Sequence, residues 1–292
     1  MSLWWTKTCI DRFRRTRLSR SMAASGFCPR CKTTHTLPTT SDAAAQVQQL
    51  HSSLQKSTLP QYPTIKKKGK VIGVLVCVDK SGTQTTTLKA FAGAIDGQWH
   101  VPDWSPVVGG VGTSPAELPL YQQIQQQTNV LAERQQHLRQ LLVHPQYQED
   151  NTLTCSSNSS RVANNNNTID NSNSNSSSSN TERMRVRQEI LDIAKERKAL
   201  SREALKEMRR NQIVCNFRGE TAVLTDVWTY PKIPAGVGDC CAPKLLADAA
   251  RQGLRPVSIA EIVVGGDNDG MLRDACAERC HPIMGFMLCG IE

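Results

Sequence analysis

Two pairs of cysteines near the C-terminus have the residue types and spacing of a metal site. Cys240 and Cys241 are adjacent in "PAGVGDCCAPKLL", and Cys276 and Cys280 are four residues apart in "DACAERCHPIMGFML". Structural zinc sites use four thiolate or imidazole ligands, whereas catalytic sites use three and a water molecule. A helix-like pattern follows each pair, and the N-terminus of a helix stabilises the negative charge of a cysteine thiolate. We expect these four cysteines to supply zinc ligands; the alternative is that they are small buried core residues.

A weaker second set lies in "FCPRCKTTHTL", with Cys28, Cys31 and His35. The C-x-x-C spacing is that of half a zinc knuckle. Either Cys28 and Cys31 bind a metal ion together with Cys276 and Cys280, which the fold would bring to them, or Cys28 and Cys31 are an incidental pair. The chain has 11 cysteines, and an odd count without a secretory signal argues against a disulfide framework.

The order of the C-terminal motifs is similar to that of zinc-dependent nucleobase deaminases. In those enzymes a ligand and a Glu lie on one helix, a strand follows, and two further cysteines open a second helix. "CCAPKLL" resembles the "CAEPK" form of the first motif in bacterial toxin deaminases, which would make Cys240 a ligand. Ala242 then stands where the general acid/base Glu is expected, and Asp239 is the nearest substitute. Asp239 is therefore the candidate catalytic residue.

The positive charge of the chain is concentrated in two segments. The net charge is +9; residues 1–26 hold one Lys and five Arg against one Asp, giving +5, and residues 182–210 hold ten basic and six acidic residues, giving +4. The Arg-rich, acid-poor head predicts a mitochondrial or plastid transit peptide or a disordered basic tail over 1–26. Met22 offers an internal start that would yield a cytoplasmic form. No apolar run is long enough to span a membrane.

Residues 27–115 are predicted to contain one helix and one β-hairpin. A helix beginning at Ser41 or Asp42 and reaching Leu54 places its apolar residues on one face. The apolar run "VIGVLVCV", the turn "DKSG" and the β-branched "TQTTTLKAFA" predict the hairpin, with its first strand buried on both faces.

Residues 116–210 are predicted to form an antiparallel helical hairpin. An a/d seam with steps of three and four residues runs from Tyr121 to Leu142, and a second runs from Ile190 to Ala204. The Asn/Ser tract at 150–181 between them has too few apolar residues to fold. The two arms are interpreted as a packing spacer, a surface for self-association, or a basic face for RNA.

Residues 211–292 are predicted to form a Cys-rich α/β part. "CCAPKLLADAARQG" indicates a helix ended by Gly253, "RPVSIAEIVVGG" indicates a strand, and Pro282 marks the first turn of a last helix. "QIVCNF" is either a strand or the end of the preceding helix. The fold class is therefore α+β: a small mixed α/β core, with a deaminase-like layout as one option, and an inserted helical hairpin.

Taken together, these segments resemble the long N-terminal extension of bacterial RluA-type RNA pseudouridine synthases. The specific strings are "PAG-x-G-[DE]-C-x-A-PKLL" and "C-x3-C-x-PI-x-G-x-ML", in the same order and over roughly residues 27–292. The resemblance implies RNA modification, with RNA or an RNA-modifying enzyme as the partner. The chain has no "HRLD"-like catalytic motif, so the resemblance implies no synthase activity. Three functions follow: a zinc-binding accessory module, a deaminase-like hydrolase, or a helical scaffold.

Overall fold

The computed structural model describes residues 23–56, 65–67, 69–110, 113–115, 117–143 and 174–291. Contacts divide the chain into two compact units, one containing the residues up to Gln122 and from Leu205 onward, the other Gln123–Ala204. Residues 1–22 of the predicted transit peptide and residues 150–173 of the Asn/Ser tract lie outside the described residues.

The core of the first unit is a four-stranded antiparallel sheet in the order β4-β3-β7-β8. The strands are β3 (Lys70–Val78), β4 (Thr85–Phe91), β7 (Arg255–Val264) and β8 (Leu272–Arg273). The predicted hairpin is confirmed as β3 and β4, and the predicted C-terminal strand as β7. Because β7 pairs with β3 along nearly its whole length, the parts described from sequence as 27–115 and 211–292 form a single unit.

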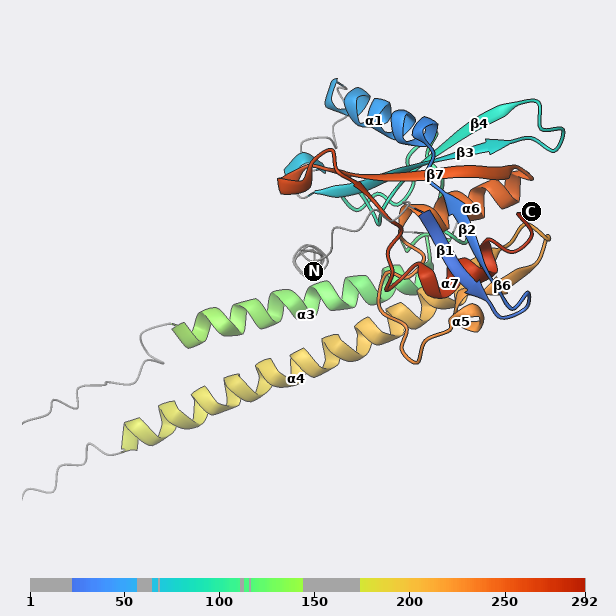
Figure 1. The fold of residues 1–292 in the computed structure, drawn as a ribbon. Coiled ribbons are helices and arrows are strands. Elements are labelled where there is room, and N and C mark those ends of the chain that lie inside the picture. The colour runs from blue at the N-terminus through green and yellow to red at the C-terminus, as the bar shows by residue number, and fades with distance from the viewer. Residues whose placement is uncertain are drawn as a thin grey trace, which may run out of the picture. The chain divides into compact units, whose positions relative to one another are not determined.

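Helices cover both faces of this sheet (Figure 1). One face packs against α1 (Ser41–Lys56), and the other against α6 (Cys241–Gln252). Strand β3 is buried on both faces, as predicted, because alternate side chains such as Ile72 and Leu75 enter the two different cores. The expected C-cap of α6 is confirmed, since Gly253 has a φ of 67°.

A smaller layer is formed where a second hairpin crosses the last helix. Strands β1 (Ala23–Cys28) and β2 (Thr33–Pro38) pair with each other, and β1 packs on α7 (His281–Met287). Pro282 lies in the first turn of α7, as predicted. Gly26 and Gly285 face each other at the crossing, where a Cβ on either would collide with backbone atoms of the other element. Residues 23–26 therefore belong to the fold, which corrects the predicted boundary of the head at residue 26.

Short elements complete this unit. They are β5 (Ile213–Cys215), β6 (Thr221–Val223), α5 (Leu224–Val227) and a 3-10 turn, η2 (Gly266–Asn268). Strands β5 and β6 pair antiparallel, so the strand alternative for "QIVCNF" is the one that the structure adopts.

The second unit is a helical hairpin formed by the parts of α3 (Pro119–Val143) and α4 (Ser174–Asn211) that lie within Gln123–Ala204. Leu138 packs with Val186 and Ile193, and the Gln135 amide donates to the Ile190 carbonyl at 3.1 Å. The predicted seam is therefore filled by the second helix of the same chain. Helix α4 begins earlier than expected, so residues 174–181 are helical rather than part of an unfolded tract.

These elements confirm the predicted α+β class. Among the helices that the structure describes, none has both the length and the apolar character needed to cross a membrane.

The crossing of β1 and α7 predicts an unusual response to Gly285→Ala. Alanine favours helix over glycine by about 1 kcal/mol, yet the new Cβ would collide with the Phe27 backbone. We expect a net loss of about 1–3 kcal/mol in the free energy of unfolding, measured by denaturant unfolding. Ser25→Ala, on the opposite side of β1, is the control and should change stability little. An increase in stability for Gly285→Ala would contradict the close packing.

Candidate metal centre

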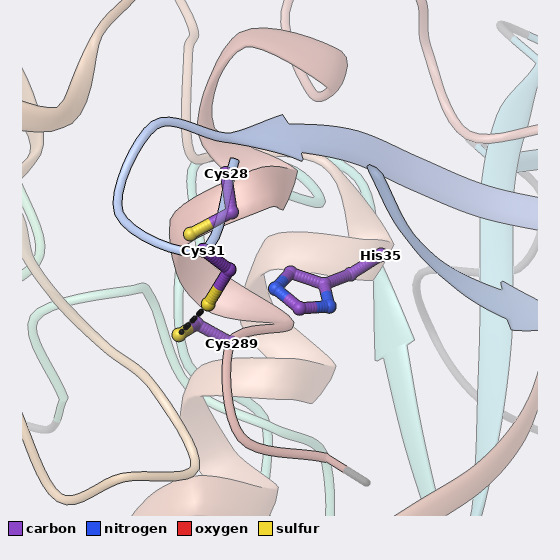
Figure 2. Close-up of side chains that lie close together, drawn as sticks. All are labelled: Cys28, Cys31, His35 and Cys289. Carbon is purple, nitrogen blue, oxygen red and sulfur yellow. Dashed lines mark hydrogen bonds between the residues drawn. The ribbon is translucent and has the colours of Figure 1, made fainter. Parts of the chain in front are cut away.

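Four metal-ligating side chains converge at the end of the β1–β2 hairpin. Cys28, Cys31, His35 and Cys289 each offer one ligand atom, and these four atoms all lie within 4.8 Å of one another. Figure 2 shows the three sulfur atoms together, with the His35 ring directed toward them. The sulfur atoms of Cys31 and Cys289 are 3.4 Å apart.

The local geometry of the hairpin positions three of these ligands. Cys28 ends β1, and the Lys32 N–H donates to the Cys28 carbonyl at 2.8 Å, with Lys32 in the left-handed region at a φ of 56°. This tight turn places Cys31 beside Cys28. His35 lies on β2 opposite Gly26. The spacing C-x-x-C followed by H-x-L therefore folds as a zinc-knuckle-like turn.

Cys289 reaches the cluster through tertiary packing. It directly follows the last turn of α7, and its carbonyl accepts a hydrogen bond from the Phe217 N–H at 3.0 Å. Because Gly26 and Gly285 allow β1 to approach α7 closely, the end of that helix meets the hairpin turn. The cluster thus joins the first and last described elements of the chain.

The surroundings act differently on the individual thiols: burial and the hydrogen bond with Cys31 raise the pKa of Cys289, although Arg218 lowers it. Arg218 donates through Nε to Cys289 Sγ at 3.2 Å and lies near Cys31 Sγ at 3.9 Å. Burial opposes ionisation of Cys28, but hydrogen bonds from the backbone N–H groups of Cys31 and Arg30 lower its pKa overall. Cys28, His35 and Cys289 are buried and Cys31 is half-buried. Three thiols and one imidazole can hold a metal ion, and this donor set is compatible with zinc.

Sequence reasoning found three of these residues and missed Cys289. The structure brings Cys28 and Cys31 together with Cys289, not with the predicted Cys276 and Cys280. The spacing of residues along the chain could not indicate Cys289 as a ligand, because Cys31 and Cys289 are 258 residues apart. The only available clue was that a C-x-x-C half-site requires further ligands.

The set predicted from the C-terminal motifs is only partly brought together. Cys240, Cys276 and Cys280 lie near enough to affect one another's protonation, but among the described residues they do not form a group of ligand atoms that could hold a metal ion. The thiol of Cys241 points instead to the sheet, where it contacts the carbonyls of Val71 and Ala90 at 3.4 and 3.5 Å. The Cys241 thiol therefore packs on β3 and β4 and does not join a cluster of metal ligands.

Protonation of these thiols differs from the expectation. The hydrogen bond with Cys276 raises the pKa of Cys240, and those with Cys240 and Cys276, followed by burial, raise the pKa of Cys280. The N-terminus of α6 does not overcome these effects, so the metal-free thiols are neutral.

Asp239, the candidate catalytic residue, lies in a buried charge network. Burial raises the pKa of its carboxyl to about 6, although the positive charges of Lys244, Arg279 and Lys70 act in the opposite direction. Lys244 is itself fully buried. Its ammonium donates to the carbonyls of Phe91 and Gly93 at 3.0 and 2.9 Å, and burial lowers its pKa.

A second buried carboxyl, Glu261 on β7, lies near the C-terminal thiols. Its Oε1 accepts a hydrogen bond from the Ala242 N–H at 2.9 Å, in the first turn of α6. Burial raises the pKa of Glu261 to about 7, although the charge of Arg273 lowers it. Nothing in the sequence analysis had singled out Glu261, since a lone Glu in a strand pattern reads as a solvent-facing residue.

Comparison of the chain with family models, curated proteins and solved structures finds no match.

The raised pKa of Asp239 predicts a pH dependence of stability in the metal-free protein. A folded-state pKa of about 6 exceeds the unfolded value near 3.9. The folded state therefore holds the proton more tightly, and stability falls as pH rises from about 4 to about 6. Asp239→Asn should reduce this fall by on the order of 1–3 kcal/mol, and the part due to Glu261, whose pKa is raised to about 7, should remain. Urea unfolding with chelator at several pH values measures it.

The exposed carboxylate variant Asp226→Asn is a suitable control, and its profile should follow that of the unmodified protein. If the free energy of unfolding of Asp239→Asn changed with pH as steeply as that of the unmodified protein, Asp239 would be ionised in the folded state.

Proposed function

We propose that the protein is a zinc-stabilised accessory module that acts in RNA modification. The observation that carries the metal half of this proposal is the convergence of Cys28, Cys31, His35 and Cys289. Zinc is the ion that best fits three thiolates and an imidazole. Four protein ligands fill a tetrahedral coordination shell, so the ion at this centre is structural rather than catalytic.

Zinc at this centre would tie the β1–β2 hairpin to the segment that follows α7. Cys28, Cys31 and His35 belong to the β1–β2 hairpin, whereas Cys289 follows α7. A structural ion bound only by the folded state adds its binding free energy to folding. Arg218, which contacts two of the sulfurs, would partly neutralise the net negative charge of three thiolates and one zinc ion.

The RNA half of the proposal is supported by the motifs that resemble the extension of RluA-type pseudouridine synthases. "GKVIGVLVCVDKSG" contains β3, the string from "PAGVGDCC" to "IVVGG" contains α6 and β7, and "CAERCHPIMGFML" contains α7. The resembling strings thus build one core. This chain contains no "HRLD"-like motif, so the module would assist recognition or assembly and leave isomerisation to a separate catalytic domain.

A basic face on α4 offers a surface for RNA. Arg187, Lys198 and Arg202 are exposed, and steps of 11 and 4 residues place them on one side of a helix. Val186 and Ile193 point into the seam with α3, so this basic face lies away from the packed one. Exposed Lys and Arg side chains on one helix face bind phosphates without sequence preference.

The first test of the proposal is the metal content of ligand variants. Cys289→Ser should lose one zinc ion per chain relative to the unmodified protein and should melt several degrees lower, because this tie is removed. Inductively coupled plasma mass spectrometry and calorimetry measure the two effects.

The control is Cys77→Ala, which removes a buried thiol of β3 and should leave the zinc content unchanged. A strong chelator should lower the melting temperature of the unmodified protein more than that of Cys289→Ser. Unchanged zinc content in Cys289→Ser would exclude the proposed centre.

The second test is the salt dependence of RNA binding. The triple variant Arg187→Gln, Lys198→Gln, Arg202→Gln should bind an unmodified transfer RNA transcript roughly tenfold more weakly, with a slope of log K against log salt reduced by about 2 to 3. Fluorescence anisotropy at several salt concentrations gives both values.

A matched variant carries three Gln substitutions on the first unit, at Lys67, Lys80 and Arg255, all exposed. It removes the same charge and should retain most of the affinity. Equal losses in the two variants would show that net charge, not the α4 face, governs binding.

A further inference from the structure

Two sulfur atoms of the candidate metal centre lie in direct contact. The Sγ atoms of Cys31 and Cys289 are 3.4 Å apart, and the dashed line in Figure 2 joins them. Two sulfurs bonded to one tetrahedral zinc ion at about 2.3 Å would be roughly 3.8 Å apart. A disulfide needs an S–S distance of about 2.05 Å, which small rotations of the two side chains can supply. The two thiols can therefore form a covalent bond as well as share an ion.

The two thiols differ in their access to solvent. Cys289 is only 1% exposed, whereas Cys31 is half-buried. The neighbours of Cys31 in the hairpin turn, Arg30 and Lys32, are exposed. Oxidation of cysteine depends on exposure of its sulfur. A dissolved oxidant therefore reaches Cys31 first, and Cys289 is already in contact with the sulfur that has reacted.

One guanidinium holds these two sulfurs side by side. Arg218 donates through Nε to Cys289 Sγ at 3.2 Å, and its Nη2 lies 3.9 Å from Cys31 Sγ. Gly290, with a φ of 89°, leaves room for this side chain, since a Cβ there would stand 2.6 Å from Cγ of Arg218. The Phe217 N–H donates to the Cys289 carbonyl at 3.0 Å. The turn between β5 and β6 therefore fixes both Cys289 and the cation beside the pair.

We propose that Cys31 and Cys289 are a site of reversible oxidation to a disulfide, and that this oxidation expels the metal ion. Disulfide formation is a property of the thiol pair itself, whereas the release of metal rests on the proposed function. The disulfide removes two of the four ligands. Cys28 and His35 remain, and two ligands do not fill the tetrahedral shell that a structural zinc ion requires.

The oxidant is a hydroperoxide, and two steps complete the reaction. The Cys31 thiolate attacks a peroxide oxygen, so that an S–O bond forms, the O–O bond breaks and hydroxide leaves. The Cys289 thiolate then attacks the Cys31 sulfur, so that the S–S bond forms, the S–O bond breaks and a second hydroxide leaves. Two protons convert the hydroxides to water. The two sulfurs lose two electrons in total, and the two oxygens of the peroxide gain them.

The disulfide keeps the same two parts of the chain together that the ion ties. Cys31 lies in the turn of the β1–β2 hairpin, and Cys289 follows α7, 258 residues away. A covalent bond between them restrains the unfolded chain and so favours the folded state after the ion has left. Cys28 and His35 stay in place beside the pair. Reduction by a dithiol therefore restores the complete ligand set.

The first arm of the test identifies the disulfide in the full chain without metal. The unmodified protein is treated with a chelator, then with hydrogen peroxide, and its tryptic peptides are sequenced by tandem mass spectrometry. Cleavage after Arg30 separates Cys28 from Cys31. We expect a bond between Cys31 and Cys289 that dithiothreitol removes. A bond between Cys28 and Cys31 instead, or no disulfide at all, would overturn the inference.

The second arm tests the order of the two steps. The double variant Cys28→Ser, Cys289→Ser lacks both thiols that could trap the oxidised sulfur, so peroxide should leave a sulfenic acid on Cys31 that dimedone labels. In Cys31→Ser the buried Cys289 should stay unlabelled under the same conditions. Cys77, a buried thiol on β3, is the internal control and should remain reduced in both variants. Labelling of Cys289 in Cys31→Ser would overturn Cys31 as the residue that reacts first.

The third arm measures the release of metal from the zinc-loaded, unmodified protein. Peroxide should release one zinc ion for each Cys31–Cys289 bond formed, followed with a coloured zinc chelator, and dithiothreitol with added zinc should restore the bound ion. Zinc that stays bound to the disulfide form would overturn the coupling between oxidation and release. Absence of zinc from the reduced protein would overturn the proposed centre and with it the release step, whereas the first arm would still decide the disulfide.

Discussion

The antiparallel pairing of β3 with β7 is the interaction on which the rest of the first unit depends. It joins residues 70–78 to residues 255–264 and so inserts a C-terminal strand into the middle of a sheet begun by the N-terminal hairpin. Both strands are buried because α1 and α6 cover the two faces. The same register sets Gly73 against Glu261, so the start of α6 can approach the sheet closely with a carboxylate beside it.

The second constraint is the crossing of β1 over α7. Two glycines, Gly26 and Gly285, allow the backbones to approach at a distance that side chains would prevent. This contact brings the C-x-x-C turn next to Cys289. The candidate metal centre therefore combines a local turn, which needs only neighbouring residues, with a thiol that arrives through packing. A bound ion would reinforce this contact between the hairpin and the end of the chain's last helix.

Buried charge distinguishes the region around the start of α6 from the remaining core. Asp239, Lys244 and Glu261 are all buried, and burial of ionisable groups costs free energy unless they are paired or hydrogen-bonded. Here Lys244 is held by two carbonyls and Glu261 by a backbone N–H. Groups with such perturbed pKa values occur frequently at functional sites. The start of α6 therefore combines buried charge with perturbed protonation, which makes it a candidate for chemistry beside the Cys28 cluster.

The sequence by itself determined the local elements: the α1 helix, the β3–β4 hairpin, the Gly253 cap, the Pro282 helix start and the two-helix seam. Each depends on periodicity or on capping residues within a short window. Tertiary structure alone decided which thiols meet. Cys289 joins Cys31 across 258 residues. Cys241 turns its thiol to the carbonyls of β3 and β4 and so takes no part in a ligand cluster. Ligand sets depend on distances between side chains, and those distances exist only after the strands and helices have packed.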